Sequence, residues 1–271
     1  MLDQTNLLAD CSNCFGLCCV ALPFAKSSDF AVDKDAGRPC KNLQDDFRCG
    51  IHTSLRRKGF TGCTVYDCFG AGQKVSQHTH GGTSWRDAPE SASGMFEVFP
   101  VVRQLHELLW YLSEARSLQQ TRIIFSELDA QIERTKNLAD GPASAILRID
   151  VAAHRAEVNV LLLRTSELVR SSLGGKRSRK TEHRGADLIG AKFRGANLRG
   201  ANFRGAYLIG ADLRAADLEG ADLIGADLRG ADLRGARLRG SIFLTRFQIN
   251  GAIGDAATAL PDSLPRPAHW S

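Results

Sequence analysis

Residues 186–240 decide the fold and read ADLIG AKFRG ANLRG ANFRG AYLIG ADLRA ADLEG ADLIG ADLRG ADLRG ARLRG, one five-residue phrase written eleven times without a gap. The first position is always Ala, the third is Leu or Phe, and the fifth is Gly except at Ala215. A fixed short period indicates stacked identical units. A helix of 3.6 residues per turn cannot keep a period of five on one face, and repeated Gly weakens helices. We therefore predict a β-solenoid whose Ala and Leu or Phe side chains point to one interior.

The pattern A-[DN]-[LF]-x-G over 186–240 resembles the pentapeptide-repeat family, with degenerate copies at 241–243 and 246–248. The resemblance implies a four-sided right-handed β-helix with four repeats in each coil, and it also makes an end-to-end homodimer one expected assembly. Side chains twenty residues apart should then stack about 4.8 Å from each other, as neighbouring strands do. Arg194, Arg214 and Arg234 would form one such column.

The charges of the repeats bear on one activity known in that family. A few of its members mimic DNA and bind topoisomerases through an acidic surface. The repeats here hold nine Lys or Arg against seven Asp or Glu. This balance removes the main physical support for a DNA mimic.

The totals describe a mildly basic chain of 271 residues with net charge +5, long enough for two or three modules. The first ten residues show no secretory apolar region, and no stretch approaches eighteen uncharged apolar residues. We expect a soluble, cytoplasmic protein without a membrane span. In that compartment, eight cysteines suggest metal ligands or redox thiols rather than a disulfide framework.

All the cysteines lie in the first quarter of the chain, and we predict that all of them are metal ligands: Cys11, Cys14, Cys18, Cys19, Cys40, Cys49, Cys63 and Cys68. The spacing Cys11-x2-Cys14 suits a tight turn that brings two thiolates to one ion, about 2.3 Å from zinc. A loop-rich module of this size needs such cross-links because its apolar core is small.

The same segment resembles a widespread bacterial family named for its CxxCxxCC motif and described as a putative zinc- or iron-chelating domain. The match is carried by residues 40–43, 47–52 and 59–68. The upstream half departs by one residue, because three residues separate Cys14 from Cys18 where the motif has two. The resemblance implies zinc, or alternatively iron or an iron–sulfur cluster, as the cofactor.

The cysteine pattern leaves three interpretations open. One is a structural metal site that holds the module closed. Another is iron or an iron–sulfur cluster, which the adjacent Cys18 and Cys19 and the excess over four thiols would suit. The last is a set of redox-active thiols or disulfides. His52, His78 and His80 are further candidate ligands, and an extended segment would point the last two to one side.

Between 95 and 173 the apolar spacing predicts three antiparallel helices in a bundle. The third helix shows a coiled-coil-like seam that consists of Ile146, Ile149, Ala153, Ala156, Val160 and Leu163. We expect His106 and His154 to be packed or surface residues rather than ligands. Pro100 should start or kink the first helix.

The expected organisation is a mixed, multi-module chain: a Cys-rich metal-binding module at 1–90, a helical bundle at 95–173, a basic linker at 174–185, the β-helix at 186–250 and a C-terminal cap or tail at 251–271. Residues 243–250 should continue the coil loosely. The proline-rich tail should add no further coil, and Trp270 should cover the open end of the apolar core.

The function predicted from the sequence is binding. We can name no Ser/His/Asp set, phosphate loop or paired carboxylates at informative spacing. We expect a zinc- or iron-binding pentapeptide-repeat protein that acts as a scaffold for an unknown protein partner rather than as an enzyme. One alternative is a zinc- or iron-dependent enzyme or redox protein centred on residues 11–68. Another is topoisomerase or nucleic-acid binding through the β-helix.

Overall fold

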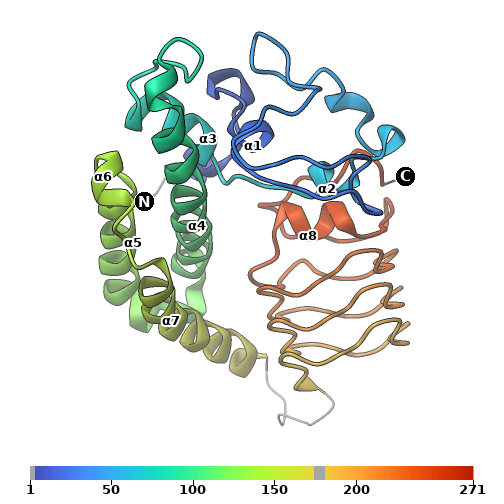
Figure 1. Ribbon diagram of the computed structural model, residues 1–271. Coiled ribbons are helices and arrows are strands. Elements are labelled where there is room, and N and C mark those ends of the chain that lie inside the picture. Colours follow the sequence, from blue (N-terminus) through green and yellow to red (C-terminus); the bar gives the residue numbers. More distant parts are fainter. Residues whose placement is uncertain (1–3, 174–180, 271) are drawn as a thin grey trace. The chain divides into compact units, whose positions relative to one another are not determined.

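The computed structural model describes residues 4–173 and 181–270 (Figure 1). The chain divides into two compact units, Met1–Ser117 with Ile123–Leu162 and Leu118–Arg122 with Leu163–Ser271. The predicted module boundaries stay a prediction, and residues 174–180 of the predicted basic linker lie outside the described residues. Within the described ranges, every helix is too short or too polar to cross a membrane.

The cysteine-rich part of the first unit is built from short helical turns joined by loops. They are η1 (Gln4–Leu7), η2 (Cys11–Asn13), α1 (Leu17–Val20), η3 (His52–Ser54), η4 (Arg56–Lys58), α2 (Thr61–Thr64), α3 (Ala71–Gln73) and the π-helical turn η5 (Lys74–Thr79). Two isolated antiparallel bridges, Phe24 with Lys34 and Leu43 with Cys49, tie its loops together. Its regular structure is therefore sparse.

Longer helices follow along the chain, and the division between the two units falls within two of the segments. After η6 (Pro89–Ser91) come α4 (Ala92–Ser117), η7 (Gln119–Ile124), α5 (Phe125–Ala139), α6 (Ala143–Ile146) and α7 (Val151–Ser172). The three predicted helices are present as α4, α5 and α7, and Pro100 lies inside α4. Leu17 and Val20 of α1 share one buried core with Val98 and Val102 of α4.

The predicted seam of the third helix is wrong. Val160 is 64% exposed, whereas His154, Val158 and Leu162 of the same helix are buried. The buried stripe of α7 includes the polar residues His154, Thr165 and Ser166. A prediction based on apolar residues alone therefore identifies the wrong face of the helix as buried.

The second unit contains the repeats as a stack of coils (Figure 1). Parallel bridges join residues twenty apart, such as Asp187 with Tyr207 and Tyr207 with Asp227. This register confirms four repeats in each coil. Within the described residues the repeats form isolated bridges rather than extended strands, because the chain turns a corner every five residues. The repeats thus form a β-helix type of fold, and its right-handedness stays a prediction.

The side chains follow the repeat phrase. From Ala201 to Leu238 the first- and third-position side chains are buried, at 2% exposure or less. Most residues at the fifth position, where the coil turns a corner, have a positive φ. At the positive-φ glycines between 185 and 235 the angle lies between +61° and +68°. Ala215 takes the same left-handed backbone with φ +55°, although an L side chain disfavours it.

The C-terminal part differs from the prediction in two places. Residues 243–250 do not simply continue the coil, because α8 (Arg246–Gly251) interrupts it, started by a capping box of Thr245 and Gln248. The tail does add rungs, since Ile253 pairs with Asp232 and Ala259 pairs with Arg237.

Trp270 closes against the last rungs. It is 6% exposed, and its indole Nε1 donates to the Ala252 carbonyl at 3.2 Å. A Cβ built on Gly254 would lie 2.4 Å from the Trp270 ring, so only glycine lets the ring pack this closely. This contact is what we expect of a lid.

Candidate metal centre

The candidate ligands all lie in the first unit, and all eight cysteines are free thiols. Cys11 is exposed and the other seven are half-buried. Cys11 opens η2 and Cys14 is its C-cap, while Cys18 and Cys19 are consecutive on α1. Cys63 lies on α2.

One group of thiols lies against the apolar core. Cys14, Cys18 and Cys68 pack on the buried cluster formed by α1, α3 and α4. A Cβ built on Gly72 would lie 2.6 Å from the Sγ of Cys14 and 4.0 Å from the Sγ of Cys68. Gly72 therefore makes room for two thiols that are 54 residues apart in the chain.

Another group surrounds the loop hairpin of residues 40–50. The Cys40 amide donates to the Cys19 carbonyl at 2.9 Å, which fixes the hairpin to α1. Leu43 and Cys49 form an antiparallel bridge, so Cys40 and Cys49 stand on the two arms of one hairpin. The Asn42 side-chain amide donates to the Cys40 Sγ at 3.8 Å.

Burial keeps most of these thiols protonated. It raises the pKa of Cys63 to about 12 and the pKa of Cys68 to about 11. The pKa of Cys11, Cys14 and Cys49 is also raised, with burial as the largest cause. A metal ion that binds here must displace protons, because the thiolate is the ligand.

Cys18 and Cys19 share a contact, with their Sγ atoms 3.9 Å apart. The hydrogen bond to Cys19, followed by burial, raises the pKa of Cys18. The same hydrogen bond lowers the pKa of Cys19. Cys19 is thus the thiol of this pair that ionises first.

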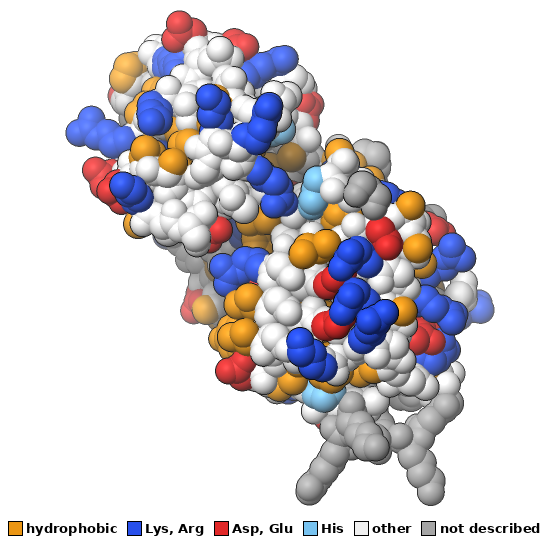
Figure 2. Space-filling view, turned by 90° about the vertical axis from the view of Figure 1, so that its right-hand side faces the viewer, with side chains coloured by type: hydrophobic (Ala, Val, Ile, Leu, Met, Phe, Trp, Pro, Cys, Tyr) orange, Lys and Arg blue, Asp and Glu red, His pale blue; other side chains and the backbone are white. Residues whose placement is uncertain are grey.

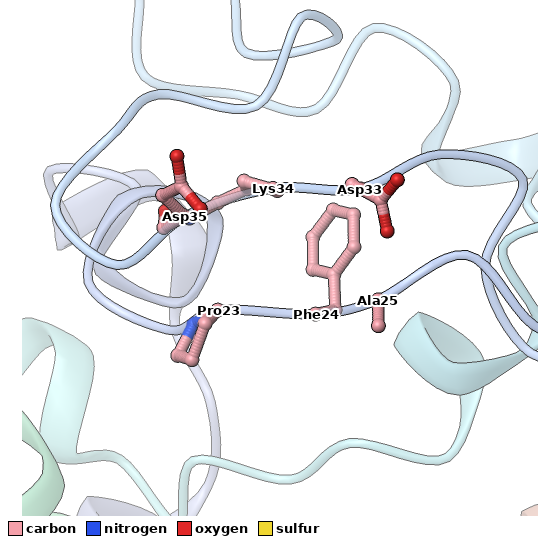
Figure 3. A pocket seen from close by; sticks show the side chains of 6 residues that line it. All are labelled: Pro23, Phe24, Ala25, Asp33, Lys34 and Asp35. Atoms are coloured by element: carbon pink, nitrogen blue, oxygen red, sulfur yellow. The ribbon is translucent and has the colours of Figure 1, made fainter.

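Lys34 brings a positive charge beside the thiols. It is 8% exposed, and its Nζ donates to the carbonyls of Val20 at 3.0 Å, Leu22 at 2.5 Å and Asp35 at 3.0 Å. Figure 3 shows the neighbouring segments that carry Phe24 and Lys34, with Asp33 and Asp35 on either side of the lysine. Lys34 contributes to the lowered pKa of Cys19, after the hydrogen bond from Cys18.

Helix α4 holds the backbone on either side of Cys68. Arg103 Nε donates to the Asp67 carbonyl at 2.9 Å, and His106 Nδ1 lies 2.7 Å from the Phe69 carbonyl. Burial lowers the pKa of His106 to about 4, so its neutral ring donates from Nδ1. His106 is a packed residue, as predicted, and it fixes the loop that carries Cys68.

The predicted arrangement of His78 and His80 is wrong, and their role as ligands, with that of His52, stays a prediction. His78 and His80 do not lie on an extended segment, because residues 74–79 form the π-helical turn η5. Residues two apart on a helical turn point to different sides, so the side chains of His78 and His80 do not point in the same direction. His80 Nδ1 lies 3.3 Å from the Val75 carbonyl, and His52 is exposed.

The cysteines offer soft sulfur donors of the kind that zinc and iron sites use. Among the residues that the structure describes, no three His, Cys, Asp or Glu side chains already converge on one metal position. The hydroxyl of Tyr66 is buried without a hydrogen-bond partner. Burial, and then the charges of Cys18 and Cys68, raise the pKa of Tyr66, so these thiols lie near its ring. An unpartnered phenol near these thiols could donate a hydrogen bond to a metal-bound thiolate while keeping its proton.

Sequence reasoning identified the cysteines but missed three residues around them, Lys34, Tyr66 and Gly72. Only Tyr66 and Gly72 carried a signal, since they flank Cys68 closely in the chain. Lys34 is an ordinary lysine between two aspartates in the sequence, and only its burial against backbone carbonyls distinguishes it.

The predicted arginine column follows from the register of twenty residues, and two of its three arginines form ion pairs. Arg214 and Asp212 approach to 2.6 Å, as do Arg234 and Asp232. Figure 2 shows basic side chains interleaved with acidic ones rather than a surface of one sign. Because Arg214 and Arg234 share their charge with neighbouring carboxylates, the column gives weak support to binding a polyanion.

Comparison with known proteins places the repeats in a family. The family model for pentapeptide repeats matches residues 184–220 and 206–243 with eight copies, which confirms the predicted repeat. A protein of Bacillus subtilis (strain 168) that bears the name "Uncharacterized protein YybG" is 63% identical over 265 residues, which cover 98% of this chain and 95% of that protein.

Two solved structures also show similarity. One is a pentapeptide repeat protein from the Arabidopsis thaliana thylakoid lumen, 30% identical, covering 36% of this chain and 79% of that chain with a TM-score of 0.20. The other is a pentapeptide repeat protein from Nostoc Pcc 7120, 28% identical, covering 38% of this chain and 88% of that chain with a TM-score of 0.24.

Proposed function

The chain is a pentapeptide-repeat protein that belongs to the same family as YybG of Bacillus subtilis, and from this premise we propose that it is a metal-binding scaffold. In this proposal the cysteines of the first unit hold zinc or iron, and the repeats present a rigid surface to a protein partner. The observation that carries it is the gathering of eight free thiols in one compact unit.

The metal would act as a cross-link. Tetrahedral thiolate sites contribute folding free energy directly, because the ion joins segments that the chain alone holds loosely. The helical turns between Gln4 and Thr79 are six residues long at most, and their loops share few backbone bridges. A module with so little regular structure gains most from ligands that come from distant loops, such as Cys14 and Cys68.

The repeats supply the scaffold part of the proposal. Ile189 is 59% exposed and Tyr207 is 53% exposed on the same face of the coil, where Tyr207 bridges Asp187. Large apolar side chains placed together on a rigid surface favour contact with another protein, since aromatic and aliphatic anchors dominate such interfaces. The neighbouring column of paired arginines would set a polar rim.

Chelation of the full chain tests the metal part. The protein is purified anaerobically, treated with a chelator under reducing conditions and digested with a protease at low dose. Loss of metal should expose cleavage sites in residues 11–68, and added zinc or iron should restore protection. The repeats, which need no ligand, should keep their circular dichroism and resist cleavage throughout. A chain that holds no metal and shows the same cleavage pattern before and after chelation would contradict the proposal.

The surface part needs a matched pair of variants. A protein that co-purifies with the wild-type chain should be lost from Ile189→Asp/Tyr207→Asp and kept by Arg234→Glu, which changes the neighbouring column. Equal retention by both variants would move the partner site away from this face.

A further inference from the structure

We propose that the first coil of the repeats, residues 181–200, is an interaction surface that binds the first coil of a second copy of this chain. The two copies would meet edge to edge around a two-fold axis. The inference goes beyond the proposed scaffold, because it requires neither a bound metal nor another protein. It rests on the burial, the backbone hydrogen bonds and the charges of this coil.

The apolar core of the repeats is incompletely covered at the first coil. Its inward side chains are only half-buried, and they are Ala186, Leu188, Ala191, Phe193 and Ala196. The residues twenty further along the chain hold the same inward positions and are 0% exposed, as at Leu208 and Leu213. The core therefore reaches the surface at this end, and a cover would gain hydrophobic free energy.

The backbone of the first coil is also an open sheet edge. In the next coil, the amide at the second position of each repeat donates to the coil before it, as Asp212 does to the Ala191 carbonyl at 2.8 Å. Within the described residues, the corresponding amides of Asp187, Lys192 and Asn197 have no acceptor. Such an edge pairs with another chain unless something covers it.

The opposite end of the repeats is closed by the chain itself. Ile253 and Ala259 add rungs there, and Trp270 is buried against Gly254. The edge that matches the first coil in outline and in the spacing of its donors is therefore the first coil of another copy. Contact between two identical edges requires a two-fold axis, which makes their strands antiparallel.

The charges favour a two-fold axis that passes through the corner at Gly190. This axis exchanges the face before the corner with the face after it, so Asp187 lies opposite Arg194 of the second copy. Both side chains are exposed, and opposite charges across paired strands stabilise the pairing. An axis through the face of Lys192 and Arg194 would instead place two basic faces against each other.

Proline at position 192 tests the edge. Residue 192 is extended, since it forms a parallel bridge with Asp212, and its amide has no acceptor within the described residues. Lys192→Pro therefore removes a donor from the proposed contact alone, because proline is tolerated on an edge where the amide is unpaired. Lys192→Ala keeps the amide and is the matched control.

The mass of the full chain is measured by light scattering over a series of concentrations. The wild type and Lys192→Ala should form dimers, and Lys192→Pro should be a monomer with the same circular dichroism. A wild type that stays monomeric throughout the series would overturn the inference. So would a Lys192→Pro variant that dimerises as strongly as the wild type.

Charge reversal tests the axis. Arg194→Asp should weaken the dimer, because it places two carboxylates opposite each other, whereas Arg239→Asp in the last repeat should not. The double variant Asp187→Arg/Arg194→Asp restores opposite charges and should recover dimerisation. A single and a double variant that dimerise equally would contradict this axis.

Hydrogen exchange of the wild type gives an answer even if Lys192→Pro does not fold. The backbone amides of residues 186–198 should exchange faster in dilute protein and become protected as the concentration rises. Exchange that does not depend on concentration would overturn the proposal. Constant protection would mean that the same chain covers the edge, and constant rapid exchange would mean that nothing does.

Discussion

Replacing Ala215 with glycine should stabilise the repeats. Ala215 is the one corner of the eleven repeats that lacks glycine, yet its backbone has φ +55° like the corners around it. Gly195 and Gly235 occupy the same corner one coil before and one coil after, with φ +65° and +68°. The column thus contains one residue in a conformation that disfavours its side chain.

The size of the effect follows from two opposing terms. The left-handed conformation costs a residue with a Cβ roughly 1–2 kcal/mol. Glycine in its place lowers the free energy of unfolding by about 0.4–1 kcal/mol, because the unfolded chain becomes more flexible. Ala215 is exposed, so no buried contact is lost. We expect a net gain of about 0.5–1 kcal/mol, which corresponds to a rise in Tm of about 1–4 °C for a domain of this size.

The reverse change provides the control. In Gly195→Ala the added Cβ would meet no atom within 4 Å, so the only cost is the backbone conformation. Thermal unfolding of the full chain, followed by circular dichroism, should therefore show Ala215→Gly shifted up and Gly195→Ala shifted down by similar amounts. If both variants melt with the wild type, corner strain does not limit the stability of this coil.

Three further changes follow from the same structure. Gly72→Ala should lower metal content at least several-fold, because its Cβ would lie 2.6 Å from the Sγ of Cys14; Gly94→Ala, whose Cβ meets nothing within 4 Å, should keep full metal in the same elemental assay. Thr245→Val should cost about 1 kcal/mol in chemical unfolding by removing the capping box of α8, and an unchanged midpoint would show that α8 needs no cap. Metal should leave as pH falls, since the raised pKa of the buried thiols favours protonation; a zinc indicator should detect this release, and retention in acid would show that protons do not compete for the ligands.

The repeat fold is readable from the sequence because its information is local. Each five-residue unit specifies its own corner and inward side chains, and the register of twenty follows from stacking four of them. The helix at the end of the coil was not predicted, although the sequence contains a local signal for it. Thr245 and Gln248 are spaced as a capping box, which predicts that a helix starts there. The sequence analysis instead predicted that the degenerate repeats continue the coil.

The candidate site was only partly readable. Its thiols are evident from the sequence, but their grouping depends on contacts between distant segments, such as Cys14 with Cys68 across Gly72. The same holds for Lys34, whose role comes from burial. The seam of α7 failed for another reason, since His154 occupies a core position by bonding to Thr135 at 2.9 Å. A period read from apolar residues alone cannot detect a polar residue that is buried in a core.

Elemental analysis of the full chain, purified without oxygen, tests the central claim most directly. The count of bound metal is compared with the count of reactive thiols before and after chelation. The account predicts bound zinc or iron and thiols that become reactive only when the metal is removed. A metal-free chain with all eight thiols reactive from the start would contradict it.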